Sequence, residues 1–457
     1  MRCPAERVTE LAVSVVRLCE WGHTSRHDLT EQERQALIDS AVHWQKENRF
    51  SAPPLAFSGT DGRTLVARQY VGVVEASGRT VEIYPKLDTH LVQQEEVVED
   101  SQAASVMRSL LWMLDVADVG AAAEANTAAL QETPTQFLDL FAYLLGKNLR
   151  AELSRGVARS YEGYEDELAA VRGRIRIVAQ VGGNWNRMDR IACGWDEFTP
   201  DTAINQLLRC TCRQLARRAR HAQTALLLQE CLGLLEDVSD VSIATALHGV
   251  TNLRHWDRST ERFRRSFELA HRLLRGFGHS LAAGQEDTFV FLLDMNVVFE
   301  SYVRAVLEAR FGVAVEEQRF VGQLLDLRAG GIRQYADFYF RDQEGAVWIG
   351  DAKYKHLAAE QAGAARFASA SGAGEEATLR SQRVDPADVR QLTVYAELDR
   401  LRGGHPGRAN LLLLYPFVGA SAFAADQAMA WNGSTIYLAP VRVTRVNQLR
   451  DNFPSLD

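Results

Sequence analysis

The sequence predicts an α+β region in its N-terminal and middle parts, followed by an α/β domain with a mixed central sheet. One clear β-hairpin and several helical patterns succeed one another as far as about residue 275. Beyond a glycine-containing stretch, helices are interleaved with β-branched and aromatic strands. We therefore expect a mixed region at 1–120, a mostly helical region at 121–275 and the α/β domain at 284–457.

The N-terminal region contains the patterns of helices and of one hairpin. Thr30 and Glu33 form a capping-box pattern, which predicts a helix over residues 30–47. Residues 63–87 alternate between apolar and polar side chains and turn at a Ser-Gly pair, which predicts two antiparallel strands. Residues 104–155 have a helical pattern.

The middle region is expected to be mostly helical. We expect an extended segment at 171–181, one long helix at 205–235 and another helix at 257–276. Five arginines crowd the long helix and are interpreted as a solvated helix face, with a contact to phosphate or to a partner as the alternative. These arginines are Arg209, Arg213, Arg217, Arg218 and Arg220.

The pattern that bears most directly on function is a second hairpin, in the C-terminal domain. Its expected strands are residues 334–340 and 346–353. A three-residue loop that ends in glycine would pair Asp342 with Ala346. A slip of this register by one residue would move side chains to opposite faces of the sheet.

Three charged side chains converge on one face of this hairpin. The register sets Asp337 opposite Asp351, and Lys353 shares the face of Asp351 because side chains alternate along a strand. Mg²⁺ is bound in proteins through carboxylate oxygens and waters, and the ion can activate a water beside a lysine. The pattern therefore predicts a metal-dependent site that cleaves phosphodiester bonds. The alternative is an exposed hairpin with ordinary surface charges.

Two flanking helices add candidate site residues. A helix is predicted over residues 294–311, and Glu300 falls within its apolar stripe, where a carboxylate needs a partner such as a metal ion or the site lysine. The alternative places Glu300 at the edge of the stripe, in contact with water. A second helix begins with Asp385 as its N-cap and carries Gln391 and Tyr395 on one face. The stripe of the first helix consists of Leu293, Val297, Val303 and Leu307.

Two further strands complete the expected sheet. Residues 409–415 are apolar throughout, as in a fully buried strand, and residues 435–443 form another strand. Residues 356–384 are rich in Ala, Gly, Ser and Glu and directly follow the hairpin, so we expect a mobile loop beside the site.

Bulk properties exclude several classes of protein. The net charge of −8 argues against a DNA-binding protein that acts alone, because neutralisation of phosphates supplies most non-specific affinity. The six cysteines form no Cys-x-x-Cys pair, and the charged first twenty residues do not resemble a signal peptide. The sequence contains no run of eighteen apolar residues, so it predicts no membrane span. We expect a cytoplasmic protein. The chain lacks a P-loop motif and should not hydrolyse nucleotides by itself.

The candidate site resembles the core of the PD-(D/E)xK nucleases, in Glu300, Asp337, Asp351 with Lys353, and Gln391. More narrowly, the sequence is similar to the McrC family, the nuclease subunits of McrBC modification-dependent restriction systems. One departure is Ala336, where the family usually has a proline that shapes the backbone. The similar segments follow in order from about residue 65 to about 440: 71–74, 81–86, 172–174, 196–201 with Asn205, Phe299 and Glu300, 350–355, Arg390 and Gln391, and Tyr395 with Ala396.

This resemblance implies a Mg²⁺-dependent DNA endonuclease that acts in antiviral defence. Asp337 and Asp351 are expected to be metal ligands, and Glu300 an accessory ligand or an acid behind them. Lys353 would steady the attacking water or the charge on the phosphate, and Gln391 would position the site. The resemblance also implies a partner, a McrB-like AAA+ GTPase ring that delivers modified double-stranded DNA. The N-terminal half of the chain would dock on this ring and stimulate its GTPase; no membrane partner is expected.

Two other functions are compatible with the sequence. The chain could be a catalytically silent adaptor that only activates the GTPase, although the intact pair of aspartates with their lysine argues against this. It could also be an independent nuclease of DNA repair or recombination. Binding of DNA by the isolated chain at physiological salt would favour that second function.

Overall fold

The computed structural model divides the chain into two compact units. One unit combines Met1–Thr135 with Leu292–Asp457, and the other is Gln136–Phe291. The structure describes residues 15–24, 27–48, 53–58, 63–87, 98, 100–119, 136–183, 189–251, 256–257, 260–283, 288–324, 331–355, 385–405, 407–418, 425–430 and 432–456.

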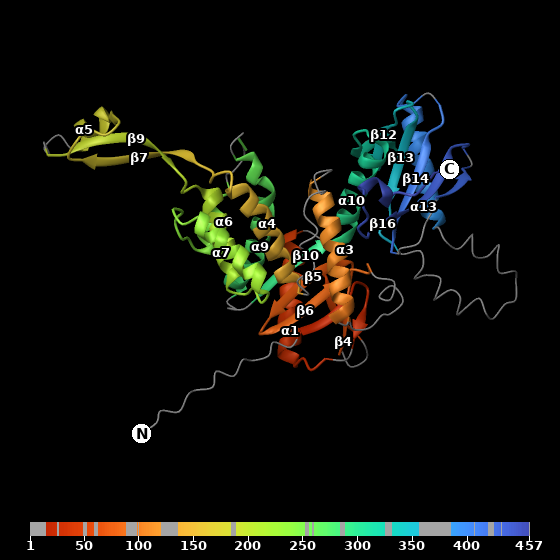
Figure 1. Ribbon diagram of the computed structural model, residues 1–457, viewed down its shortest axis with the longest axis horizontal. Coiled ribbons are helices and arrows are strands. Elements are labelled where there is room, and N and C mark those ends of the chain that lie inside the picture. The colour runs from red at the N-terminus through yellow and green to blue at the C-terminus, as the bar shows by residue number, and fades with distance from the viewer. Residues whose placement is uncertain are drawn as a thin grey trace, which may run out of the picture. The chain divides into compact units, whose positions relative to one another are not determined.

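Among its described residues, the N-terminal part of the first unit contains two small sheets and the helices α1 and α3 (Figure 1). In one sheet β1, β6 and β5 are neighbours in that order, and the other has the order β2-β4-β3. The expected capping box of α1 is confirmed, because Thr30 N–H donates to Glu33 and Glu33 N–H donates to the Thr30 hydroxyl. The bounds are β1 (Val15–Cys19), β2 (His23–Thr24), α1 (Glu31–Asn48), β3 (Leu55–Ser58), β4 (Thr64–Ala67), β5 (Tyr70–Ala76), β6 (Arg79–Tyr84) and α3 (Asp100–Val119).

The hairpin predicted within residues 63–87 is confirmed as β5 and β6. Ala76 pairs with Arg79, so the turn has two central residues, Ser77 and Gly78. Both residues have positive φ, 51° and 72°, as a two-residue hairpin turn that follows the strand twist requires.

The C-terminal part of the first unit is built on a six-stranded sheet of order β11-β12-β13-β14-β16-β15. The pairs β13–β14 and β14–β16 are parallel, and the pairs nearer the two edges are antiparallel. The predicted mixed sheet is therefore confirmed. The bounds are β10 (Phe289–Asp294), which spans the division between the units, α10 (Met295–Phe311), β11 (Glu316–Gln323), β12 (Arg333–Arg341), β13 (Val347–Ala352), α13 (Pro386–Leu401), β14 (Asn410–Phe417), β15 (Asp426–Met429), β16 (Thr435–Arg442) and the 3-10 turn η4 (Leu449–Asn452).

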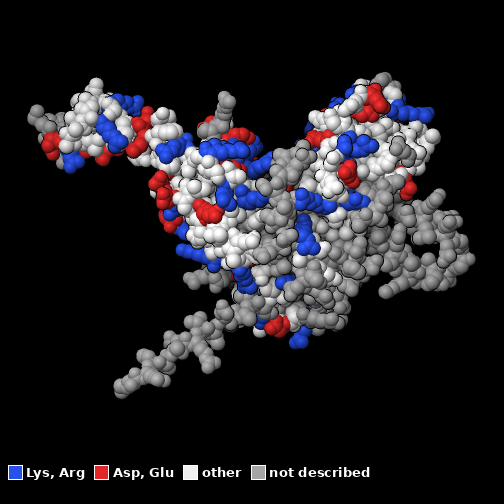
Figure 2. Space-filling model, viewed as in Figure 1, with Lys and Arg blue, Asp and Glu red and all other residues white. Residues whose placement is uncertain are grey.

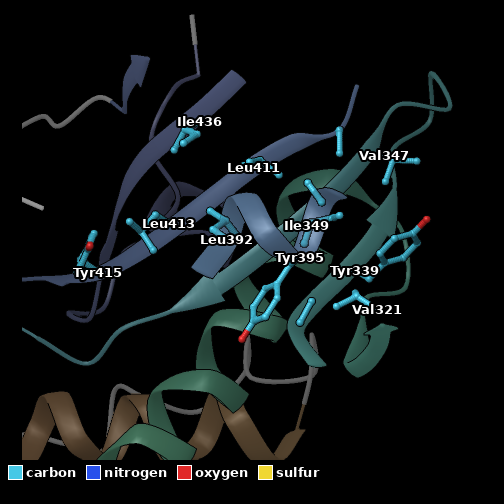
Figure 3. Close-up of a cluster of buried hydrophobic side chains, with 13 residues drawn as sticks. Val321, Tyr339, Val347, Ile349, Leu392, Tyr395, Leu411, Leu413, Tyr415 and Ile436 are labelled. Carbon is cyan, nitrogen blue, oxygen red and sulfur yellow. The ribbon is translucent and has the colours of Figure 1, made fainter. Parts of the chain in front are cut away.

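Helix α13 covers one face of this sheet. Leu392 and Tyr395 of α13 pack in a buried cluster with side chains from the strands, including Ile349, Leu411 and Leu413 (Figure 3). The aromatic rings of Phe311, Phe340 and Trp348 form a second cluster that includes the end of α10. Since β13 is buried along its whole length, the residues at its carboxyl end are held rigidly.

The helix that carries Glu300 begins and ends where the sequence predicts. Asp294 caps α10 by accepting from Asn296 N–H, and Gly312 ends it in the left-handed conformation. The predicted apolar stripe is wrong at Val297, which is 58% exposed; the buried face instead includes Val298, Phe299 and Tyr302. Glu300 therefore lies at the edge of the buried face, because Val297, one turn before it, faces water.

The second unit contains a group of helices and a separate antiparallel ribbon. Helices α4, α6, α7 and α9 pack against one another, and β7, β9 and β8 form the ribbon, which carries α5 (Figure 1). The bounds are α4 (Phe137–Leu153), β7 (Ser160–Leu168), β8 (Arg174–Ile175), α5 (Ile177–Gly183), β9 (Ile191–Thr199), α6 (Ala203–Ala216), α7 (Ala222–Leu234), α8 (Ile243–Gly249), the 3-10 turn η3 (Glu261–Phe263) and α9 (Arg264–Ala283).

Three expectations for this unit are wrong in detail. The long helix predicted at 205–235 is two helices, α6 and α7, because the chain turns before His221 and the buried carboxylate of Asp139 accepts from the N–H groups of Arg220 and His221. The segment 171–181 is extended only at β8 and then forms the short helix α5. The helix predicted to end at Gly276 is α9, which continues through Gly276 and Gly278 to Ala283.

Three of the arginines expected on that long helix contact other side chains. Arg209 and Arg213 both pair with Asp240, and Arg218 lies over the ring of Phe277. Arg217, Arg218 and Arg220 lie between the end of α6 and the start of α7, so the five arginines do not share the solvated helix face that the sequence predicted. Residues 356–384, expected to form a mobile loop, lie outside the described residues. Within the described part of the chain, no helix combines the length and the apolar character needed to span a membrane.

Candidate active site

The register of the C-terminal hairpin is the one predicted from the sequence. Phe338 pairs with Gly350, and Asp342 N–H donates to the carbonyl of Ala346 at 3.1 Å. Gly345 has a φ of 86°, as the left-handed end of the three-residue loop requires. Continued by one residue, this register sets Asp337 opposite Asp351.

Asp337 is fixed by hydrogen bonds to both carboxylate oxygens. Its Oδ2 accepts from the backbone N–H of Ala352 at 2.9 Å, and its Oδ1 accepts from the side-chain amide of Gln318 at 3.2 Å. The first bond ties Asp337 to the strand of Asp351, and the second ties it to the neighbouring strand β11. The carboxylate is thus oriented from two sides.

Asp351 and Lys353 form a buried ion pair. Nζ of Lys353 lies 2.7 Å from Oδ2 of Asp351, and Asp351 is 1% exposed. Burial raises the pKa of Asp351 to about 7, and the nearby charge of Asp337 adds to the rise, whereas Lys353 opposes it. Burial alone would lower the pKa of Lys353, but the charge and hydrogen bond of Asp351, together with the charges of Asp337 and Asp388, outweigh burial and the pKa rises. The lysine therefore remains charged beside two carboxylates.

Helix α13 brings Gln391 and Tyr395 to the same place. Nζ of Lys353 donates to Oε1 of Gln391 at 3.3 Å, and the amide nitrogen of Gln391 donates to the hydroxyl of Tyr395. Helix α13 thus places Gln391, which the family resemblance assigned to the site, beside Lys353. The chain of contacts from Asp351 through Lys353 and Gln391 holds the ammonium group in one direction.

Glu300 approaches this cluster from α10. Burial raises the pKa of Glu300 to about 7. The negative charges of Asp337 and Asp351 contribute to the rise, and the positive charge of Lys353 opposes it. All five side chains that the sequence analysis selected are therefore within electrostatic or hydrogen-bonding reach of their neighbours in the site.

The carboxylates of Asp337 and Asp351 suit a small hard cation, and they would supply fewer than three protein ligands. In the described part of the chain, no three His, Cys, Asp or Glu side chains stand together as a complete metal site. Mg²⁺ needs only one or two protein carboxylates because it keeps several waters. Oδ2 of Asp351 is buried and, beyond the ion pair with Lys353, forms no hydrogen bond with the described residues. A cation beside Asp351 and Asp337 would offset this cost of burial.

Sequence reasoning did not find Gln318. Its φ of 48° lies in the left-handed region, which is unusual for a residue other than glycine. Strained residues of this kind cluster at functional sites. The sequence carries no signal for it, since a glutamine between Glu317 and Arg319 resembles any other polar residue of an edge strand.

Another feature that bears on function is the antiparallel ribbon of the second unit. We call β7, β8, α5 and β9 the arm. Most residues of β7 are exposed, and so are large apolar side chains: Tyr161, Ile177 and Val178 are 75%, 71% and 88% exposed. Charges of both signs are interspersed on it, as Figure 2 shows, and Arg172 pairs with Glu197. An exposed apolar surface rimmed by charges is typical of a site for a protein partner.

Gly173 explains why the arm needs the sequence Arg-Gly-Arg. A Cβ atom at this position would lie 2.5 Å from the carbonyl oxygen of Gly194 and 2.6 Å from Cβ of Trp195. The φ of Gly173 is +68°. Glycine therefore lets the chain lie directly against β9, and the guanidinium of Arg172 lies over the ring of Trp195.

Comparison with known sequences identifies one family. The family described as "McrBC 5-methylcytosine restriction system component" matches residues 65–373. The match covers the N-terminal hairpin, the arm, α10 and the hairpin with Asp337, Asp351 and Lys353. No curated protein matches the chain.

Comparison with solved structures finds similar folds. One is "Refined half-complex from tetradecameric assembly of Thermococcus gammatolerans McrB AAA+ hexamers with bound McrC", with a TM-score of 0.63 and 17% identity. The similarity covers 96% of this chain and 98% of that one. A second is "Cryo-EM structure of the Thermococcus gammatolerans McrBC complex", with a TM-score of 0.48 and 21% identity over 66% of this chain and 90% of that one. At these identities the first similarity indicates the fold alone.

Proposed function

Because the chain belongs to the family of McrBC 5-methylcytosine restriction system components, we propose that it is the DNA endonuclease subunit of a McrBC-like system. The observation that carries this proposal is the convergence of Asp337, Asp351 and Lys353 at the end of one hairpin. Two carboxylates beside a charged lysine suit the hydrolysis of a phosphodiester bond, in which a water attacks and negative charge grows on the phosphate.

The proposed roles follow from the contacts. Asp337 and Asp351 would hold Mg²⁺, which when bound would polarise the phosphate and promote ionisation of a water. Lys353 would place its positive charge at the phosphate, and Gln391 would keep that charge in place through its contact with Nζ. Glu300, whose pKa burial raises to about 7, would serve as an acid behind the two ligands, because it can hold or release a proton near neutral pH.

Substitution of Asp351 and Lys353 tests the proposal. Asp351→Ala and Lys353→Ala should each abolish Mg²⁺-dependent cleavage of DNA, measured with the full chain and its partner. Asp426→Ala, which removes an exposed carboxylate from β15 of the same sheet, is the matched control and should cut normally. Full cutting by either site variant would place the nuclease activity elsewhere.

The proposed partner is a McrB-like AAA+ GTPase ring that delivers modified double-stranded DNA. The similar solved structure contains McrB AAA+ hexamers with bound McrC. This chain supplies no P-loop of its own, and its net charge of −8 is unfavourable for capturing DNA unaided. Within the N-terminal half, the arm offers the exposed apolar side chains that a protein partner needs, so we place the contact with the GTPase there.

Two measurements separate this proposal from its rivals. A chain that stimulates GTP hydrolysis by the partner but does not cut DNA with Mg²⁺ would be a silent adaptor. A chain that binds and cuts DNA at physiological salt without any partner would be an independent nuclease. The buried carboxylate of Asp351 favours the active subunit over the silent adaptor, because an unused buried charge is costly to keep.

A further inference from the structure

Glu20 is a buried carboxylate that the proposed chemistry does not use. It follows the last residue of β1 and is 2% exposed. Its backbone N–H donates to the carbonyl of Tyr84, which continues the pairing of β1 with β6. Its side chain thus emerges from the N-terminal sheet in a fixed direction.

The side chain of Glu20 joins two segments that are far apart in the sequence. Oε1 accepts from the backbone N–H of Lys86 at 2.8 Å and from the hydroxyl of Tyr354 at 2.8 Å. Lys86 follows β6 of the N-terminal hairpin, and Tyr354 follows Lys353 directly. Oε2 accepts no hydrogen bond from the described residues. The two bonds to Oε1 therefore stabilise and orient this buried carboxyl group.

Tyr354 lies between two residues of the proposed site. Its backbone is continuous with Lys353, whose own N–H donates to the carbonyl of Leu414 at 2.8 Å. Its ring contacts the ring of Phe299, with 5.8 Å between the centroids, and Phe299 is fully buried next to Glu300. A shift of the Tyr354 ring would therefore displace Lys353 and helix α10, which carries Glu300.

We propose that Glu20 and Tyr354 are positioning residues, which use the N-terminal sheet to fix the direction of Lys353 and of Glu300. This inference rests on the proposed nuclease function and assigns a part of that function to the N-terminal region. The bond from Tyr354 to Glu20 prevents the chain after β13 from rotating, because the hydroxyl is held from the N-terminal sheet while the backbone is held by β14. Lys353 stands between these two restraints.

Single-turnover cleavage of methylated duplex DNA by the full chain, with its GTPase partner, GTP and Mg²⁺, tests the proposal. Tyr354→Phe should lower the maximal rate roughly tenfold, as expected for the loss of one buried hydrogen bond that orients a reacting group, with the half-saturating DNA concentration unchanged. Tyr302→Phe is the matched control. It also removes a buried tyrosine hydroxyl, which donates to the carbonyl of Arg442 at 2.6 Å, and it should lower the melting temperature without lowering the rate.

Variants of Glu20 separate positioning from mere packing. Glu20→Gln keeps the Oε1 acceptor and should cut within about threefold of wild type, whereas Glu20→Ala should cut as slowly as Tyr354→Phe. The double variant with Glu20→Ala and Tyr354→Phe should be no slower than either single variant, because both substitutions remove the same bond between Tyr354 and Glu20. Equal rates for Tyr354→Phe and wild type, or additive losses in the double variant, would overturn the proposal.

Amide hydrogen exchange gives a readout that does not depend on cleavage. The Lys353 N–H should exchange at least tenfold faster in Glu20→Ala than in wild type or in Tyr302→Phe, since its segment loses one of two restraints. Unchanged exchange at Lys353 would also overturn the proposal. If wild type fails to cut DNA while the exchange result holds, the nuclease proposal is at fault and the link between Glu20 and Tyr354 stands.

Discussion

Gln318 donates a 3.2 Å hydrogen bond to Oδ1 of Asp337 from the neighbouring strand, in a backbone conformation that costs energy. The other oxygen of Asp337 accepts from Ala352 N–H. Gln318→Ala should therefore leave Oδ1 without its donor and raise the Mg²⁺ concentration for half-maximal DNA cleavage by about tenfold or more, because groups that orient metal ligands have effects of this size. Cleavage rates measured over a Mg²⁺ titration provide the value.

The matched control for this substitution is Gln334→Ala. Gln334 lies on β12, and its amide donates to the carbonyl of the adjacent Arg333. Its loss should leave the Mg²⁺ titration unchanged. The same Mg²⁺ requirement in Gln318→Ala and in wild type would show that Asp337 is oriented without the glutamine.

Local patterns were sufficient to predict the parts of the site that lie on one hairpin or at one helix end. The three-residue loop at Gly345 sets the register of Asp337 and Asp351, and the caps at Asp294 and Asp385 set the starts of α10 and α13. Each of these is a short-range effect of turn or cap chemistry.

What the sequence could not predict depends on distant partners. The bond between Glu20 and Tyr354 spans most of the chain, and neither residue lies in a pattern that indicates the other. Likewise Asp139 of α4 accepts from the N–H groups of Arg220 and His221 where the chain turns between α6 and α7, which no local propensity reveals. The proximity of Gln318 to Asp337 depends on the pairing of β11 with β12, and β11 is not among the strands that the sequence predicts.

The buried carboxyl of Glu20 predicts a pH dependence of stability. Burial raises its pKa from the ordinary 4.5 to about 7, although Lys86 N–H and the Tyr354 hydroxyl oppose the rise. Between these pH values the folded state binds more protons than the unfolded state, so this residue's contribution to stability is full below pH 4.5 and is lost as the pH rises to 7. The change is on the order of 3 kcal/mol.

Glu20→Gln cannot ionise and should remove this dependence. Its melting temperature minus that of wild type should increase by several degrees as the pH is raised from about 5 to about 8. Thermal melts of both proteins across this range measure the difference. Glu344→Gln, an exposed position in the hairpin loop, is the control and should follow wild type. A difference that falls with pH would show that the folded chain prefers Glu20 ionised.

Gly173 gives a test of the arm as the contact with the GTPase. Gly173→Ala introduces a Cβ atom 2.5 Å from a backbone oxygen at a φ of +68°, so the arm should be destabilised by about 1–3 kcal/mol. We expect faster proteolysis within residues 160–199 and weaker stimulation of the partner's GTPase. Gly182→Ala, in α5 with nothing within 4 Å of the new atom, should do neither. Full GTPase stimulation by an arm that proteolysis shows to be loosened would place the docking surface elsewhere.

The last prediction concerns which pieces of the chain fold alone. The C-terminal sheet shares a compact unit with residues 1–135: α10 packs against α3, and the guanidinium of Arg445 lies over the ring of Trp112. A fragment that begins at Gly284 would expose these surfaces and lose the Glu20 bond to Tyr354, so it should not melt cooperatively and should aggregate.

Residues 136–291 form a unit of their own and should fold. Residues 1–135 joined to 292–457 by a long flexible linker should also fold, yet should not stimulate the GTPase because they lack the arm. Circular dichroism melts of the three fragments and GTP turnover by the partner measure these outcomes. A cooperative melt of the fragment from Gly284 alone would show that the N-terminal sheet is dispensable for the C-terminal fold.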